Sequence, residues 1–218
     1  KLKNIFKYPL EDFYDKDQFL YKIKKLDINS NVEALIHLGA SSSTTVWDGK
    51  YLLENNYQYS IDLMNWCAQN NIHFIYASSA SVYGLGETGF SVSKSLTSPI
   101  NPYAFFKCLF DNYVENYLSS NHKFNNIVGI RFFNVYGPNE FHKKEMASPI
   151  HKFNQQLINQ GYINLFKSYG GYADGMHSRD FVYVGDCIKL ICWFLKNKQV
   201  NGIFNCGTGN TNSFLDVA

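Results

Sequence analysis

Tyr103 and Lys107 form the pair of residues with the clearest chemical potential in the sequence. They stand four positions apart in Tyr103-Ala104-Phe105-Phe106-Lys107, where a helix is expected to begin, so both side chains should lie on one helical face. An ammonium beside a phenol favours the phenolate and lowers a pKa that is ordinarily about 10. In a chain with 16 Tyr, however, this spacing alone is a weak signal of catalysis.

The segments around this pair alternate between strand and helix patterns. The apolar runs predict strands at 34–38, 72–77, 127–133, 163–166, 181–184 and 203–205, and the helical periodicity predicts helices at 17–25, 51–70, 103–118, 146–160 and 184–195. This alternation predicts an α/β fold with a parallel sheet covered by helices. Such sheets bind ligands beyond the carboxyl ends of their strands, and the small polar segments of this chain fall there.

The composition excludes several classes of function. With 218 residues, 45% of them hydrophobic and a net charge of +2, the chain suits one globular domain with room for a small second lobe, and gives no basic footprint for nucleic acid. No apolar run reaches the roughly 20 residues that span a bilayer, and no signal peptide is visible. The five cysteines and six histidines are irregularly spaced, which favours reduced thiols in a cytoplasmic protein and no metal site.

One glycine pattern is misleading. Gly84-Leu85-Gly86-Glu87-Thr88-Gly89 fits G-x-G-x-x-G, but a dinucleotide fingerprint also needs a helix after it and an acidic residue about 20 positions later. The following segment, 90–95, is a poor helix start. A loop on the substrate side is the better interpretation.

Three further motifs stand around the Tyr–Lys pair. Ser79 lies at a predicted strand end before it, and Phe132-Phe133-Asn134-Val135-Tyr136-Gly137-Pro138 and Arg179-Asp180-Phe181-Val182-Tyr183-Val184-Gly185-Asp186 follow it. The four motifs, in this order, resemble the Ser/Tyr/Lys arrangement and the R-[FY]-[FY]-N-[VP]-Y-G-P and R-D-F-V-Y-V-x-D segments of the extended, nucleotide-sugar branch of the short-chain dehydrogenase/reductase superfamily.

Segments 42–51, 55–60 and 139–148 are similar to those of the members of that branch that act on an ADP-heptose. The resemblance implies an isomerase with tightly bound NADP. Such an enzyme removes a hydride from C6 of the heptose, giving a transient ketone, and returns it to the opposite face. It thereby supplies heptose for the lipopolysaccharide inner core of a Gram-negative bacterium.

The resemblance assigns the catalytic roles to four residues. Tyr103 and Lys143 would be the two acid/base groups, one on each face of the carbon, and Ser79 would hydrogen-bond the reacting oxygen. Lys107 would hold the nicotinamide ribose. Without the resemblance, Lys143 in its polar loop would be read as a solvated charge.

The same resemblance assigns binding residues. The turn after the first predicted strand contains small residues that let a backbone approach a cofactor closely, and the positions matching cofactor contacts are Lys1, Lys16, Leu38, Gly39, Ala40, Ser41, Ser42, Asn55 and Val135. The positions matching substrate contacts are Asn134, Phe166 and Arg179, with Glu145 and Lys152 where those enzymes have Ser and His. Arg179 suits a diphosphate through its bidentate fork, whereas Arg131 is expected to be structural.

The implied fold is a Rossmann-type doubly wound parallel sheet, truncated at its first strand–helix unit, with part of a smaller substrate-binding lobe. Residues 1–140 would form a partial dinucleotide-binding domain, 141–180 part of the substrate lobe, and 181–218 the return to the first domain. Because the chain begins with Lys and stops in an opening helix, we expect a fragment that is unstable and inactive alone. The resemblance also implies a homo-oligomer, a pentamer, acting on ADP-heptose in the cytoplasm.

Two other functions stay open. The chain could belong to another nucleotide-sugar epimerase or a 4,6-dehydratase of the same branch, and these enzymes do not need a second base such as Lys143. A non-catalytic dinucleotide-binding protein is a third reading, against which the intact Ser79, Tyr103 and Lys107 argue.

Overall fold

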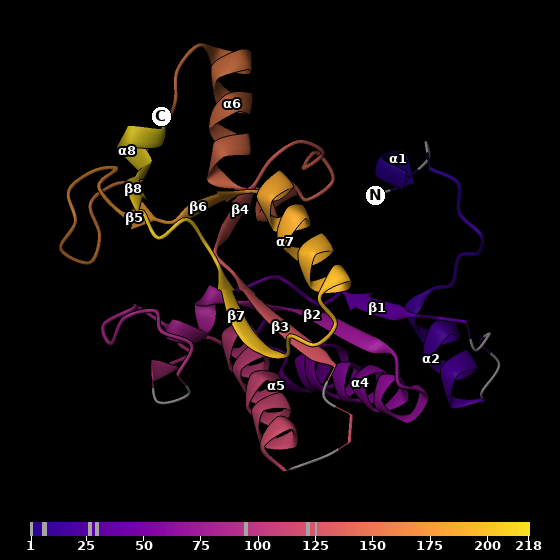
Figure 1. Cartoon of the computed structure of the whole chain (residues 1–218). Helices are drawn as coiled ribbons and strands as arrows, with labels where there is room; N and C mark the ends of the chain where they lie inside the picture. Colours follow the sequence, from indigo (N-terminus) through magenta and orange to yellow (C-terminus); the bar gives the residue numbers. More distant parts are fainter. Residues whose placement is uncertain are drawn as a thin grey trace. The chain divides into compact units, whose positions relative to one another are not determined.

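The computed structural model describes residues 2–5, 8–25, 28, 31–93, 96–120, 123–124 and 126–218 (Figure 1). Within them the chain forms two compact units. The first, called the sheet unit, comprises 2–131 and 191–205, and the second, called the small unit, comprises 132–190 and 206–218. Each unit is described by itself.

A four-stranded sheet organises the sheet unit. Its strands, in the order β1-β2-β3-β7, are β1 (Ala34–His37), β2 (His73–Ser79), β3 (Ile127–Phe132) and β7 (Gly202–Cys206). The strands β1 and β2 run parallel, with Ala34 opposite His73 and His37 opposite Tyr76. The predicted α/β class with a parallel central sheet is therefore confirmed.

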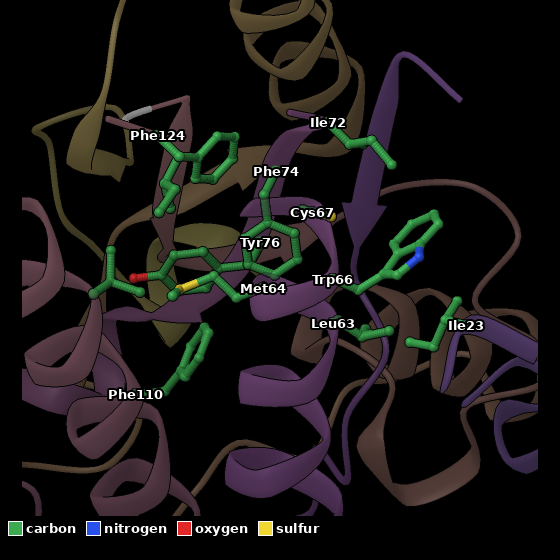
Figure 2. Close-up of a cluster of buried hydrophobic side chains, with 12 residues drawn as sticks. Ile23, Leu63, Met64, Trp66, Cys67, Ile72, Phe74, Tyr76, Phe110 and Phe124 are labelled. Atoms are coloured by element: carbon green, nitrogen blue, oxygen red, sulfur yellow. The ribbon is translucent and has the colours of Figure 1, made fainter. Parts of the chain in front are cut away.

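Helices precede the first strand and connect the others. They are α1 (Leu2–Ile5), α2 (Lys16–Lys24), α3 (Gly49–Leu52), a π-helix (Leu53–Gln58), α4 (Tyr59–Asn70), a 3-10 turn (Ala80–Tyr83) and α5 (Pro102–Ser119). Figure 1 shows α4 and α5 beside each other along the sheet. The main core lies between them and β2, and Figure 2 shows its rings and aliphatic side chains, among them Phe74, Tyr76 and Phe110.

The start of α5 fixes the place of Tyr103. Asn101 caps the helix by accepting a hydrogen bond from the Ala104 N–H at 2.9 Å, and Pro102 occupies the first helical position. Both residues favour a helix start, because the capped N–H has no partner within the helix and proline has no N–H to leave unpaired. Tyr103 therefore stands in the first turn, and Lys107 one turn later.

The small unit contains two pairs of short strands. In one pair β4 (Asn134–Tyr136) runs parallel to β6 (Phe181–Tyr183), and in the other β5 (Ser178–Arg179) runs antiparallel to β8 (Asn212–Ser213). Its helices are a 3-10 turn (Lys144–Met146), α6 (Pro149–Gln160), α8 (Phe214–Val217) and the first part of α7 (Val184–Lys196), which continues into the sheet unit. Phe153, Phe181 and Phe214 form its core.

The prediction of a strand at 163–166 was wrong. No strand forms there, because the Asn164 N–H is bonded by the Gln156 side chain at 2.7 Å rather than by a neighbouring strand. Ile163 and Leu165, whose apolar character suggested the strand, instead pack against the core of the small unit. The helix start expected at the end of the chain is present, where Ser213 and Asp216 form a capping box for α8.

Two general findings complete the fold. All five cysteines are free thiols. In the part of the chain that the structure describes, no helix has the length and apolarity needed to cross a membrane.

Candidate active site

Ser79, Tyr103 and Lys107 come together at the carboxyl end of β2. The Tyr103 hydroxyl is hydrogen-bonded to the Ser79 side chain. The Lys107 ammonium is buried and donates to the Ala77 carbonyl oxygen at 2.6 Å. The Ser79 hydroxyl accepts from the Ser81 hydroxyl at 2.9 Å. Its own proton therefore remains available for the bond to the Tyr103 oxygen. The structure thus unites the three residues that the sequence singled out in this unit.

The prediction of a lowered pKa for Tyr103 is wrong. Burial raises the pKa of Tyr103 above 10, and the hydrogen bond from Ser79 opposes this rise only in part. The pKa of Lys107 is also lowered, to about 8. Burial lowers it, and the charge of Asp111 acts in the opposite direction. Desolvation is the largest cause of both shifts, because both charged forms lose water in this site, and the charge of Asp111 raises the pKa of Tyr103 further.

Asp111 connects the active-site helix to the sheet. Its carboxylate is fully buried and accepts hydrogen bonds from the Tyr76 hydroxyl at 2.9 Å, the Ser78 hydroxyl at 2.8 Å and the Arg131 Nε at 2.8 Å. Arg131 is only 1% exposed and also donates to the Tyr83 hydroxyl at 3.0 Å. The expectation that Arg131 is structural is confirmed, and Asp111, one turn after Lys107, is its partner.

The loop 38–42, which follows β1, is mostly exposed. Its backbone is held at Ser41, whose N–H donates to the Asn56 side-chain oxygen at 2.8 Å and whose carbonyl accepts from the Asn56 amide nitrogen at 2.9 Å. Asn56 is buried, whereas Asn55, the predicted cofactor contact, is half-buried and donates to the Tyr51 carbonyl at 2.7 Å.

His37, the last residue of β1, lies beneath this loop. Its Nε2 is 2.9 Å from the Ser60 hydroxyl, which in turn donates to the Asn56 carbonyl at 2.9 Å. Since the Ser60 proton is used in that bond, a neutral His37 donates from Nε2. Burial, with a further contribution from the charge of Lys107, lowers the pKa of His37 from 6.5 to about 3.

This pKa predicts a loss of stability in weak acid. Between pH 6.5 and 3 the unfolded chain binds a proton at His37 that the folded chain does not, so the free energy of unfolding falls as the pH falls through this window. From pH 7 to 5.5 the decrease due to His37 should be about 1 kcal/mol. Urea unfolding at both pH values measures it, and the substitution His37→Gln should remove that part of the pH dependence. An unchanged dependence in the variant would contradict the assignment.

Two lysines complete the cofactor positions predicted in this unit. Lys16 pairs with Asp17 at 2.6 Å, and its ammonium lies 5.9 Å from the centre of the Tyr59 ring. It is exposed, and no contact in the described structure joins it to the loop 38–42 or to Tyr103. Lys1 lies outside the described residues.

Asp180 organises the predicted contacts Asn134 and Val135 in the small unit. Its carbonyl oxygen accepts from the Asn134 backbone N–H at 3.0 Å and from the Asn134 side chain at 3.3 Å. Its carboxylate accepts from the Thr208 N–H at 2.8 Å and the Gly209 N–H at 2.9 Å. Val135 follows Asn134 in β4, opposite Val182. The R-D-F-V-Y segment thereby holds the N-V-Y segment in register.

Glu140 holds the loop that carries Lys143. The buried Glu140 carboxylate accepts from the Gly137 N–H at 3.1 Å, the Ser148 N–H at 2.8 Å and the Ser148 hydroxyl at 2.7 Å. Burial opposes ionisation, but these bonds and the charge of Lys143 lower the pKa of Glu140 below 4.5. The Lys143 ammonium lies 3.5 Å from the carboxylate, and its side chain is 41% exposed. Lys143 is therefore a charged side chain on an anchored loop, not on a free one.

The remaining predicted substrate residues form two contact groups. Lys152 donates to the Glu145 carbonyl at 2.6 Å and lies 3.7 Å from its carboxylate, whose side chain is 98% exposed. Phe166 and Arg179 both face Phe214, with the Phe166 ring centre 4.9 Å and the guanidinium 5.9 Å from the Phe214 ring centre. Phe166 and Arg179 thus share one contact residue, Phe214.

Four buried polar residues of these sites escaped the sequence analysis, namely His37, Asn56, Asp111 and Glu140. Only Asp111 carried a readable signal, since it stands four residues after Lys107 and so shares its helical face. Among the residues that the structure describes, no group of three or more His, Cys, Asp or Glu side chains could hold a metal ion.

Comparisons with known proteins agree with this architecture. A model of the NAD dependent epimerase/dehydratase family matches residues 21–207. The chain is similar to the ADP-L-glycero-D-manno-heptose-6-epimerase of Alkalilimnicola ehrlichii, with 46% identity over 209 residues, which are 96% of this chain and 64% of that protein.

Two solved structures illustrate the likeness. The Helicobacter pylori ADP-L-glycero-D-manno-heptose-6-epimerase is 30% identical with a TM-score of 0.84, covering 99% of this chain and 66% of that one. A Thermus thermophilus UDP-glucose 4-epimerase in complex with NAD is 26% identical with a TM-score of 0.72, covering 93% and 64%.

The chain spans about two thirds of the length of these relatives. The resemblance read from the sequence motifs is confirmed by the family match and by these relatives. The match over residues 21–207 covers most of the chain. The chain belongs to the NAD dependent epimerase/dehydratase family.

Proposed function

We propose that the complete polypeptide encoded by the gene inverts C6 of the heptose in an ADP-heptose. The observation that carries this proposal is the Tyr103 hydroxyl, hydrogen-bonded to Ser79 one helical turn before the buried Lys107. The relatives named as heptose 6-epimerases support the substrate.

The residues of the sheet unit suit a dinucleotide. The Lys107 ammonium has three donors, of which the contacts described above use one, on Ala77, and the exposed turn after β1 is built of small side chains. We assign cofactor binding to Lys107, to the loop 38–42 and to Asn55, with Lys16, Val135 and Lys1 as further contacts, and we assign NADP as the form bound. When bound, NADP would supply the group that accepts the hydride from C6 and later returns it.

Tyr103 and Ser79 handle the oxygen on C6. Ser79 donates a hydrogen bond to that oxygen. Because burial keeps Tyr103 protonated, its phenol is the acid that gives a proton to the oxygen when the hydride returns to C6. The hydroxyl proton released in the preceding oxidation goes to the other acid/base group, Lys143. Lys107 supplies the positive charge beside the phenol.

The small unit supplies the substrate contacts. We assign Arg179 and Phe166 to the nucleotide diphosphate and Asn134 to the sugar. Glu145 and Lys152 contact each other. This contact reduces the repulsion that an isolated Glu145 would exert on a diphosphate. Lys143, held by Glu140, is the second acid/base group.

Substitution of Lys143 tests the two-base assignment. Lys143→Ala should lower kcat by about a hundredfold or more, since one positioned acid/base group contributes about 10²–10⁴-fold. Lys144→Ala, a change of the same kind at the next position, is the matched control and should retain most activity. Steady-state rates of the two variants decide, and normal epimerisation by Lys143→Ala would remove Lys143 from the mechanism.

Substrate choice separates this proposal from its alternative, another nucleotide-sugar epimerase or a 4,6-dehydratase. The complete polypeptide is incubated with ADP-heptose, UDP-glucose and UDP-N-acetylglucosamine in parallel, and the products are separated and identified by NMR. We expect turnover of the ADP-heptose alone. Turnover of a UDP-sugar with no change in the ADP-heptose would replace the proposal with the alternative.

We also propose that the complete protein works as a homo-oligomer, a pentamer, in the cytoplasm, and that its product enters the lipopolysaccharide inner core. The division into a dinucleotide domain and a substrate lobe belongs to the same proposal.

A further inference from the structure

Asn56 is the one side chain in the described sheet unit that brackets the backbone of the loop 38–42. Its amide makes two hydrogen bonds to the same residue, accepting from the Ser41 N–H at 2.8 Å and donating to the Ser41 carbonyl at 2.9 Å. Bonds to the N–H and the carbonyl of one residue fix the orientation of the backbone there, as well as its distance from Asn56. Asn56 is 1% exposed, so water does not compete for these bonds.

The helix around Asn56 has an unusual form. Leu53–Gln58 is a π-helix between α3 and α4, and such segments are frequent at functional sites. Within it Asn55 is half-buried and Asn56 is buried.

Asn56 is in turn held by Ser60, which His37 contacts. The Ser60 hydroxyl donates to the Asn56 carbonyl, and His37 Nε2 contacts the same hydroxyl, with both distances at 2.9 Å. His37 is the last residue of β1 and is buried. A continuous line of hydrogen bonds therefore runs from the end of β1 through α4 to the exposed loop.

This arrangement exceeds what a surface turn needs. An exposed loop can satisfy its backbone groups with water, whereas burying an amide costs free energy unless all its hydrogen bonds are made. The chain buries Asn56 and commits its amide oxygen and one amide N–H to the two peptide groups on either side of Ser41, in an otherwise exposed loop. This stretch of backbone is preorganised before any ligand arrives.

We propose that Asn56 is a positioning residue, which holds the two peptide groups on either side of Ser41 so that the backbone of residues 38–42 is in place for the dinucleotide. The inference rests on the proposed function, in which this loop binds NADP. Asn56 acts through Ser41 and need not touch the cofactor.

The test measures NADPH binding to the complete polypeptide after removal of bound cofactor. Asn56→Ala removes both bonds to Ser41 and should weaken the Kd for NADPH about tenfold. Asn56→Asp keeps the acceptor for the Ser41 N–H but loses the donor to its carbonyl, and it should also weaken binding. Gln58→Ala, an exposed position on the same π-helix, is the matched control and should leave the Kd unchanged.

A second readout separates positioning from a general loss of structure. At saturating NADP⁺, the oxidised form that accepts the C6 hydride, the folded Asn56 variants should recover the kcat of the unmodified protein, because the chemistry at Tyr103 is untouched. If Asn56→Ala fails to fold, Asn56→Asp decides by the same two measurements.

The outcomes distinguish the two levels of the proposal. An NADPH affinity in a folded Asn56 variant equal to that of the unmodified protein would overturn the positioning role while leaving the proposed function intact. An unmodified polypeptide that binds no NADPH would instead overturn the proposed function.

Discussion

Tyr103→Phe abolishes epimerisation, with an expected fall in kcat on the order of a thousandfold. The substitution removes one oxygen atom, and the contact described for that oxygen is the hydrogen bond to Ser79. The phenyl ring keeps its place in the first turn of α5, so the fold and the NADPH affinity should change little. Rates followed over a range of substrate concentrations should show the loss in kcat rather than in KM, because the proton transfer occurs in the transition state.

Tyr113→Phe is the matched control for this prediction. Tyr113 stands on the same helix, and its hydroxyl lies 3.5 Å from the Asn65 side-chain oxygen, at the limit of hydrogen-bond distance. Removing that hydroxyl should leave kcat within about twofold of the unmodified rate, since it touches no reacting group. Equal effects of the two substitutions would show that the loss at Tyr103 comes from general disturbance of α5.

Asp111→Asn should destabilise the protein by about 3–5 kcal/mol, because it leaves the Arg131 guanidinium buried without its anionic partner. This is a large part of the roughly 5–15 kcal/mol by which a domain is stable. The variant should also lower the pKa of Lys107 further, since the charge of Asp111 is what raises it against desolvation. Urea unfolding of the complete polypeptide measures the first effect, and the pH profile of kcat/KM reports the second.

The control repeats the same chemical change at an exposed ion pair. Asp186 lies 2.9 Å from Lys189, with side chains 60% and 82% exposed, and surface pairs of this kind contribute about 0–1 kcal/mol. Asp186→Asn should therefore cost less than about 1 kcal/mol. If the two substitutions proved equally mild, Asp111 would not be the anchor between α5 and β3 described here.

The sequence predicted the active-site elements because each had a local signal. The four-residue spacing of Tyr103 and Lys107 is a property of one helix, and the capping residue Asn101 with Pro102 marks where that helix begins. Ser79 is the last residue of β2, and an apolar run precedes it. In each case neighbouring residues contain the information.

The supporting residues could not be predicted in the same way, since their roles depend on burial. Asn55 and Asn56 are adjacent and chemically identical, and only the packing of the folded chain buries Asn56. The prediction of a lowered pKa for Tyr103 failed for a related reason. The spacing suggested an effect of Lys107, but desolvation raises the pKa of Tyr103, and desolvation follows from packing that no local pattern reveals.

The small unit shows the same limit. The motif around Arg179 and Asp180 was recognised, yet the bonds from Thr208 and Gly209 to the Asp180 carboxylate join segments almost 30 residues apart. The apolar run at 163–166 predicted a strand because it contains Ile163 and Leu165. Those side chains pack into a core of phenylalanines instead, and apolar residues alone do not specify which partner they will find.

The most direct test of the central claim is the fate of the hydrogen on C6. ADP-heptose labelled with deuterium at C6 is incubated with the complete polypeptide in ordinary water, and the product is examined by NMR. Removal and return of the same hydride predict that C6 is inverted and keeps its deuterium. Inversion with loss of deuterium to solvent, or no inversion at C6, would contradict the account.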